Sequence, residues 1–181
     1  MMSKFHRVTP LLPGHVQNVL FKLETLQPSG SFKDRGIGHM IDTFMSKGKV
    51  EKIICSSGGN AGHAVATVGK AVCVPVDVYV PSTTKAMMVE KIRKTGANVI
   101  IGGENWNAAD REARKALAET EGACYIPPYD DPLIWEGNSS IVDELVDANV
   151  KPGAVVLSVG GGGLLCGVQR GLERHGWSDV K

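Results

Sequence analysis

Residues 52–80 read KIICSSGGNAGHAVATVGKAVCVPVDVYV, two short apolar runs separated by a longer segment. The runs, 52–56 and 76–80, are rich in β-branched residues, which favour strands. The apolar residues between them recur at the spacing of one helix face: Ala61, Ala64, Val65, Val68 and Val72. A strand, a helix and a second strand in this order predict two parallel strands of an α/β fold.

The same alternation continues along the chain. Further strands are predicted at 98–102, 124–126 and 154–159, and a helix before the first strand carries Ile37, Met40, Ile41 and Phe44 on one face. A polar, alanine-rich helix follows Asn107, and we expect its charges to be solvated and without function. The sequence therefore predicts open parallel sheets with flanking helices.

Composition excludes several classes of protein. With 181 residues and 43% hydrophobic content, the chain can bury the core of one domain or of two small lobes. A formal charge of +1 gives no electrostatic basis for binding nucleic acid or an anionic membrane. Neither an apolar run long enough to span a bilayer nor a secretory signal is evident, so we expect no membrane association and no export.

The cysteines and histidines indicate no metal site. The four cysteines are far apart, lie in apolar runs and form no CxxC pair, which argues against zinc binding and a disulfide framework. This usage fits a reducing, cytosolic setting. The five histidines are scattered along the chain, and the sequence gives none of them a role.

Four consecutive glycines, 160–163, lie between the apolar run 154–159 and a helix in SVGGGGLLCG. Consecutive glycines let several backbone N–H groups converge, and the helix N-terminus adds partial positive charge, so the pattern predicts a phosphate-binding loop. It is neither a Walker loop, which needs Gly-Lys-Ser/Thr, nor a dinucleotide fingerprint. A tight turn without a ligand is the alternative, but such a turn needs only one or two glycines.

The stretch CSSGGNAGHA, residues 55–64, also follows a strand and opens a helix. Ser56, Ser57 and the backbone N–H groups of residues 58–61 would lie at a positive helix end, which suits a carboxylate or another anion. Asn60 adds an amide donor and an acceptor. By itself the stretch is equally consistent with a serine N-cap and a glycine turn.

Lys33 lies in PSGSFKDRG, residues 28–36, where a helix begins. The simplest interpretation is an exposed lysine in the first turn, but the helix dipole disfavours a cation there and lowers its pKa. A lowered pKa favours the neutral amine that attacks a carbonyl or accepts a proton. A lysine nucleophile beside an aromatic residue, a phosphate loop and a carboxylate site together predict binding of pyridoxal phosphate and an amino acid.

Together these motifs resemble the fold-type II family of pyridoxal-phosphate enzymes, whose fold is like that of the tryptophan synthase beta chain, and more narrowly the serine/threonine dehydratases. PSGSFKDRG resembles the lysine motif of that family, SSGGNAG its substrate loop and SVGGGGLLCG its phosphate loop. IPPYDDPLIWEG, residues 126–137, and VPSTT, residues 80–84, resemble the animal-type L-serine dehydratases. The resemblance covers the chain from Thr9 onward.

The resemblance implies a role for each motif residue. Lys33 would be the catalytic lysine that forms the Schiff base with pyridoxal phosphate, and Phe32 would stack on the pyridine ring. Asn60 would bond the phenolic oxygen of the cofactor. The phosphate would be held by Gly160, Gly161, Gly162, Gly163 and Leu164. The substrate carboxylate would be received by Ser57, Gly58, Gly59, Asn60 and Ala61.

The implied reaction is deamination of L-serine to pyruvate and ammonia, with L-threonine giving 2-oxobutanoate. After the substrate displaces Lys33, its amine would remove the α-proton as general base. The family also implies a cytoplasmic enzyme, a small amino-acid substrate and a homodimer. Its two lobes would comprise residues 1–39 and 131–181, part of the large cofactor-binding lobe, and residues 40–130, the small lobe.

The sequence departs from the family pattern in three places. Asp34 after the lysine is common in threonine synthases, so a threonine-synthase-like or cysteine-synthase-like activity stays open. The segment 9–21 is shorter than the family's first loop and helix, and its Pro13-Gly14 would break a helix. The chain stops after WSDVK, where the next strand would begin, so we expect a fragment with an incomplete large lobe. A catalytically silent chain that binds pyridoxal phosphate or a partner subunit is therefore the other alternative.

Overall fold

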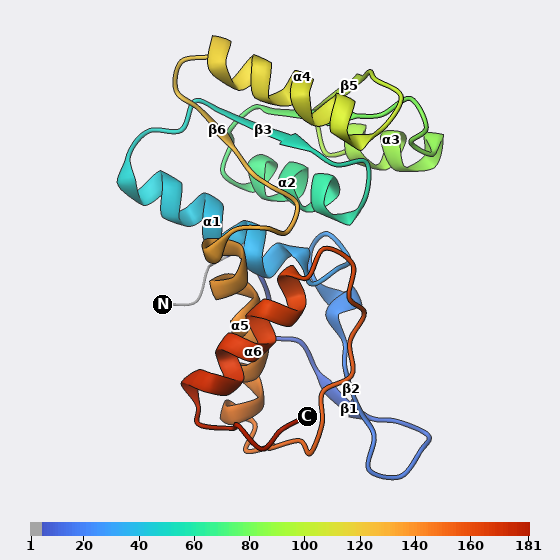
Figure 1. The fold of residues 1–181 in the computed structure, drawn as a ribbon, viewed down its shortest axis with the longest axis vertical. Helices are drawn as coiled ribbons and strands as arrows, with labels where there is room; N and C mark the ends of the chain where they lie inside the picture. Colours follow the sequence, from blue (N-terminus) through green and yellow to red (C-terminus); the bar gives the residue numbers. More distant parts are fainter. Residues whose placement is uncertain (1–4) are drawn as a thin grey trace.

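The computed structural model describes residues 5–181, and a parallel sheet flanked by helices organises it (Figure 1). The sheet has four strands in the order β5-β4-β3-β6, and every neighbouring pair is parallel. Its strands are β3 (Lys52–Ser56), β4 (Val76–Val80), β5 (Asn98–Ile101) and β6 (Ala123–Tyr125). These bounds confirm the α/β fold and four of the predicted strands, each within one residue at either end.

Two layers of helices cover the sheet. Helix α4 (Trp106–Glu119) lies on one face, and α2 (Asn60–Ala71) and α3 (Ala86–Arg93) lie on the other (Figure 1). The core between them is aliphatic, with Ile53, Val78 and Ile92 all fully buried. Because all strands are parallel, their carboxyl ends share one edge, and the loop after β3 emerges there.

The remaining elements lie beyond α1 (Lys33–Lys47), which separates them from the sheet in Figure 1. Helix α5 (Pro132–Asp147) packs against both α1 and α6 (Gly163–Arg174). A short antiparallel hairpin, β1 (Leu11–Pro13) and β2 (Leu20–Lys22), and the turn η1 (Glu24–Leu26) precede α1. The hairpin agrees with the expectation that Pro13-Gly14 interrupts a helix in this segment.

The strand predicted at 154–159 is wrong. Among residues 5–181 the structure places no strand beside this segment, and Val156 and Val159 are 96% and 59% exposed. Its backbone pairs only with Lys181, whose N–H donates to Gly153 O at 3.2 Å and whose carbonyl accepts from Val155 N at 2.7 Å. A strand needs a ladder of such bonds, so a β-branched apolar run without a neighbouring strand stays extended and irregular.

Candidate active site

Lys33 is the first residue of α1, and its amine lies between the start of that helix and the segment after β6. The Nζ atom donates to the carbonyl of Pro128 and lies 5.2 Å from the ring centre of Phe32 and 6.0 Å from that of Tyr129. Burial lowers the pKa of Lys33 to about 8. The direction is the one predicted, but the cause is burial rather than the helix dipole.

The glycine loop meets Lys33 through Tyr129. A Cβ atom on Gly161 would lie 2.3 Å from Cγ of Tyr129, and one on Gly163 would lie 2.5 Å from the Tyr129 carbonyl oxygen. Gly162 is the N-cap of α6 with a φ of 83°, a left-handed conformation that side chains disfavour. The glycines therefore allow Tyr129 to pack directly on the loop, which brings the lysine and the predicted phosphate site together. Leu164, half-buried, follows in the first turn of α6.

The loop from Ser57 to Gly59 leads into α2, and Gly59 is its N-cap. A Cβ on Gly58 would lie 2.6 Å from Oγ1 of Thr84, so the loop is closely packed against the segment after β4. Asn60 is exposed at the start of α2, whereas Ala61 is buried and can offer only its backbone N–H. No hydrogen bond within residues 5–181 joins the Asn60 side chain to Lys33 or to the glycine loop.

The predicted substrate loop and the turn before Lys33 are connected by His63, one turn after Asn60. Its Nδ1 atom lies 3.0 Å from the carbonyl oxygen of Ser29, so Nδ1 carries the proton of this bond. The backbone N–H of Ser29 in turn donates to Oδ2 of Asp34 at 2.7 Å. Ser29 is therefore bonded to α1 through its N–H and to α2 through its carbonyl. No sequence pattern predicted the contact with His63.

Asp34 stabilises this turn and has no contact with the lysine amine. It is fully buried, and burial raises its pKa to about 6, although the hydrogen bonds from Ser29 oppose the shift. The Asp34 carboxylate accepts a hydrogen bond from the turn that precedes its own helix, and this bond explains its presence in structural terms. Asp34 therefore does not by itself favour threonine-synthase-like chemistry.

Helix α4 holds the residue before the predicted substrate loop, so one of its charges, that of Asp110, is hydrogen-bonded inside the protein rather than solvated as expected. It begins at Trp106, with Asn105 as N-cap, rather than after Asn107. Ser56, the buried residue before the loop, donates through Oγ to Oδ1 of Asp110 at 2.6 Å, and its carbonyl accepts from Nε1 of Trp106 at 2.7 Å. Tyr125 lies 2.8 Å from the Ser56 hydroxyl and also donates to Asp110.

Asp110 is ionised in this network. Burial would raise its pKa, but the hydrogen bonds from Ser56, Tyr125 and Arg114 outweigh burial and hold the pKa below its ordinary value. Arg114 bonds Oδ2 of Asp110 at 2.8 Å, and its guanidinium lies 4.5 Å from the Tyr125 ring centre. The carboxylate thus fixes the end of β3 and β6 next to the loop.

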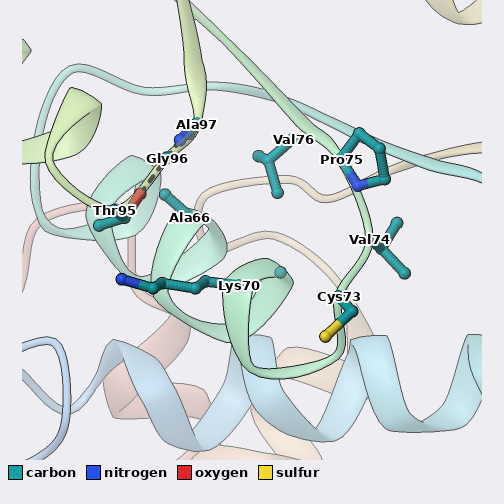
Figure 2. Close-up of a pocket in the computed structure, with 10 residues that line it drawn as sticks. Ala66, Lys70, Cys73, Val74, Pro75, Val76, Thr95, Gly96 and Ala97 are labelled. Carbon is teal, nitrogen blue, oxygen red and sulfur yellow. Dashed lines mark hydrogen bonds between the residues drawn. The ribbon is translucent and has the colours of Figure 1, made fainter.

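Two surface cavities lie away from Lys33. One of about 280 Å³ is lined by Lys70, Cys73 and Thr95 and lies at the amino ends of β4 and β5, opposite the predicted substrate loop (Figure 2). The other, of about 340 Å³, lies between α4 and the end of β5. Neither includes a predicted site residue, so the candidate site rests on the meeting of the three motifs.

Residues 5–181 show neither a metal-binding cluster nor a membrane-spanning helix. No group of three or more His, Cys, Asp or Glu residues in this part of the chain could hold a metal ion. None of the helices described there is long and apolar enough to cross a membrane.

Known proteins resemble this chain in sequence and in fold. The family model described as "Pyridoxal-phosphate dependent enzyme" matches residues 2–181. L-serine dehydratase/L-threonine deaminase of Bos taurus is 50% identical over 160 residues, which are 88% of this chain and 49% of the relative. The serine dehydratase-like protein of Homo sapiens is 43% identical, with 97% of this chain and 55% of the relative covered.

Among solved structures, an L-serine ammonia-lyase from Rhizomucor miehei superposes with a TM-score of 0.86 at 38% identity, covering 97% of this chain and 58% of that one. Threonine deaminase isoform 2 from Solanum lycopersicum gives 0.86 at 29% identity, covering 98% and 50%. The chain spans about half the length of the curated relatives it matches. By sequence and by fold, it belongs to the family of pyridoxal-phosphate-dependent enzymes.

Proposed function

We propose that this chain binds pyridoxal phosphate through Lys33 and deaminates L-serine to pyruvate and ammonia, with L-threonine as a second substrate. The observation that carries the proposal is the half-buried Lys33 amine, with a pKa of about 8, beside Tyr129 and the glycine loop. The names of the relatives support the same reaction.

The residues present fit the cofactor. An amine with a lowered pKa can react with an aldehyde near neutral pH, and a loop in which Gly161 and Gly163 leave no room for Cβ offers backbone N–H groups to a phosphate. Gly160 to Gly163 and Leu164 would hold the phosphate, Phe32 would contact the ring, and Asn60 would bond its phenolic oxygen. When bound, pyridoxal phosphate withdraws electrons from the α-carbon of the amino acid.

The chain's own residues would then bind the substrate and move its proton. The backbone N–H groups from Ser57 to Ala61 would receive the carboxylate at the start of α2, where the helix dipole favours an anion. The Lys33 amine, held in place by the Pro128 carbonyl, would accept the α-proton as general base. The hydrogen-bonded ends of β3 and β6 would keep the predicted substrate loop rigid during this step.

The larger assembly is also a proposal. The sheet and α2 to α4 lie within residues 40–130, which supports assigning that range to a small lobe and residues 1–39 and 131–181 to part of a large one. Residues 1–4 of the large lobe lie outside the described residues.

All four cysteines are free, as suits a cytosolic enzyme. A homodimer is the assembly to test by light scattering.

A chain that binds pyridoxal phosphate or a partner subunit without turnover is the second candidate. The exposed, irregular segment 154–159 favours it, because this segment leads directly into the glycine loop. A synthase-like reaction, which needs a second substrate, is the third.

Incubation with pyridoxal phosphate and L-serine, with and without an added nucleophile, distinguishes the three candidates. Pyruvate release supports the deaminase, and L-threonine should then give 2-oxobutanoate. Covalent cofactor binding without any keto acid would favour the silent chain, and product formation only with an added nucleophile would favour a synthase.

The rate at which Lys33 captures pyridoxal phosphate should rise with pH. The neutral amine reacts, and because burial lowers the pKa of Lys33 to about 8, its neutral fraction increases through that pH and is nearly complete one to two units above. Stopped-flow absorbance at constant ionic strength should therefore show a half-maximal rate near pH 8. A midpoint near 10.5, the ordinary value, would show that the amine is solvated.

A further inference from the structure

We propose that Asn138 is a positioning residue that sets the distance between Lys33 and the phosphate loop, so that one small molecule can reach both. This inference rests on the proposed function. It concerns a side chain in the middle of α5 to which neither the motifs nor the resemblance gives a role.

The side-chain amide of Asn138 joins two backbones. Its Oδ1 atom accepts from the N–H of Gly36 at 3.1 Å, and its Nδ2 atom donates to the carbonyl oxygen of Gly163 at 3.0 Å. Gly36 lies in the first turn of α1, three residues after Lys33, and Gly163 is the last glycine of the loop. Asn138 therefore touches both parts of the predicted cofactor site and is only 1% exposed.

Chemistry explains why an amide occupies this position. In a regular first turn the Gly36 N–H would bond the carbonyl of the N-cap residue Phe32, but that carbonyl accepts from Arg35 N at 3.0 Å, so the Gly36 N–H takes its acceptor from Asn138. The Gly163 carbonyl, at the first residue of α6, can accept a second hydrogen bond besides the one within its helix. An amide carries both an acceptor and a donor on one planar group, a carboxylate carries only acceptors, and a leucine carries neither.

Close packing prevents the helices from adjusting around this amide. A Cβ on Gly36 would lie 2.9 Å from Oδ1 of Asn138 and 2.6 Å from the carbonyl oxygen of Ile134. A Cβ on Gly167 in α6 would lie 2.4 Å from Cβ of Asn138. Helices α1, α5 and α6 thus meet at glycines around Asn138. Because the packing is close, a shift of the backbone at Gly36 would also shift the backbone at Gly163.

The test compares two ligands that differ only at the phosphate. Pyridoxal phosphate would engage Lys33 and the glycine loop together, whereas pyridoxal has the same aldehyde and no phosphate. Asn138→Leu removes the acceptor of the buried Gly36 N–H and the side-chain link to the Gly163 carbonyl, so we expect the ratio of the affinities for pyridoxal phosphate and pyridoxal to fall about tenfold. Fluorescence quenching of Trp135, whose Nε1 bonds the Tyr129 carbonyl at 3.1 Å, can report both affinities.

A second variant keeps the test decisive if the leucine variant does not fold. Asn138→Asp retains the acceptor for Gly36 but loses the donor to Gly163 and adds charge beside the loop, so it should lower the same ratio. The matched controls are Asn107→Leu and Asn107→Asp on the exposed side of α4, which should leave the ratio unchanged.

The outcomes separate this inference from the proposed function. If both ligands lose affinity equally in the Asn138 variants, or neither does, Asn138 has only a structural role and the inference is overturned. If the wild-type chain does not bind pyridoxal phosphate at Lys33, the proposed function itself fails. A fall in the ratio with the wild-type site intact supports both.

Discussion

Lys33→Ala should lower pyruvate formation from L-serine by at least about 100-fold, the smallest loss typical of removing a general base. The expectation follows from the geometry of the amine. The half-buried amine faces Pro128 and Tyr129 next to the glycine loop, and partial burial lowers its pKa to about 8. A keto-acid assay coupled to NADH oxidation measures the loss.

Lys115→Ala is the matched control. Lys115 is exposed on α4, and its removal should leave the rate unchanged. Residual activity of the Lys33 variant within a few-fold of wild type would show that another group takes the proton.

The second large effect is expected on stability, from a buried ion cluster behind the active site. Arg35 is fully buried and bonds Glu144 through Nη1 at 2.5 Å and Glu24 through Nε at 2.7 Å. Lys22 also donates to Glu144, so the cluster joins β2, η1, α1 and α5. Glu144→Gln leaves Lys22 without its carboxylate and Arg35 with Glu24 alone, and this loss of buried pairing should cost about 3–5 kcal/mol of unfolding free energy.

Urea unfolding of this variant should be compared with Glu173→Gln, an exposed carboxylate on α6 whose loss should leave the midpoint unchanged. A double replacement, Arg35→Met with Glu144→Leu, should cost less than the sum of the single ones, because it removes both charges together. Additive costs, or a single cost below about 1 kcal/mol, would contradict a coupled buried pair.

The same cluster predicts how stability depends on pH. Burial would raise the pKa of Glu144, but its bonds to Arg35 and Lys22 outweigh burial and hold it below the ordinary value of 4.5. A carboxyl whose pKa is lower in the folded than in the unfolded state stabilises the protein fully at pH values above its unfolded-state pKa. This stabilisation is lost as the pH falls through the folded-state pKa. Glu144→Gln should therefore flatten the decline of stability in acid.

The local features of the fold could be predicted from the sequence. Strands β3 and β4 and helix α2 follow one another with a clear change of period, and the structure confirms them. The run 154–159 carries an equally strong strand pattern, yet it is irregular because strand formation depends on a neighbour that local sequence does not specify. Periodicity reports which residues can form a strand, and pairing decides whether they do.

The site was predictable in its motifs but not in what connects them. Tyr129 and Asn138 act through contacts with residues far away in the sequence, and no local pattern marks either one. Helix α4 did carry a signal. Trp106, Asp110 and Arg114 are spaced four residues apart and so share one face, which the expectation of a solvated helix overlooked.

The most direct test of the account is to find where pyridoxal phosphate attaches to the wild-type chain. The purified protein would be mixed with the cofactor, reduced with borohydride, digested and mapped by mass spectrometry, with Lys33→Ala in parallel. The account predicts one cofactor adduct per chain, on the peptide that contains Lys33, and none in the variant. Labelling spread over exposed lysines, or equal labelling of the variant, would contradict the assignment of the active site.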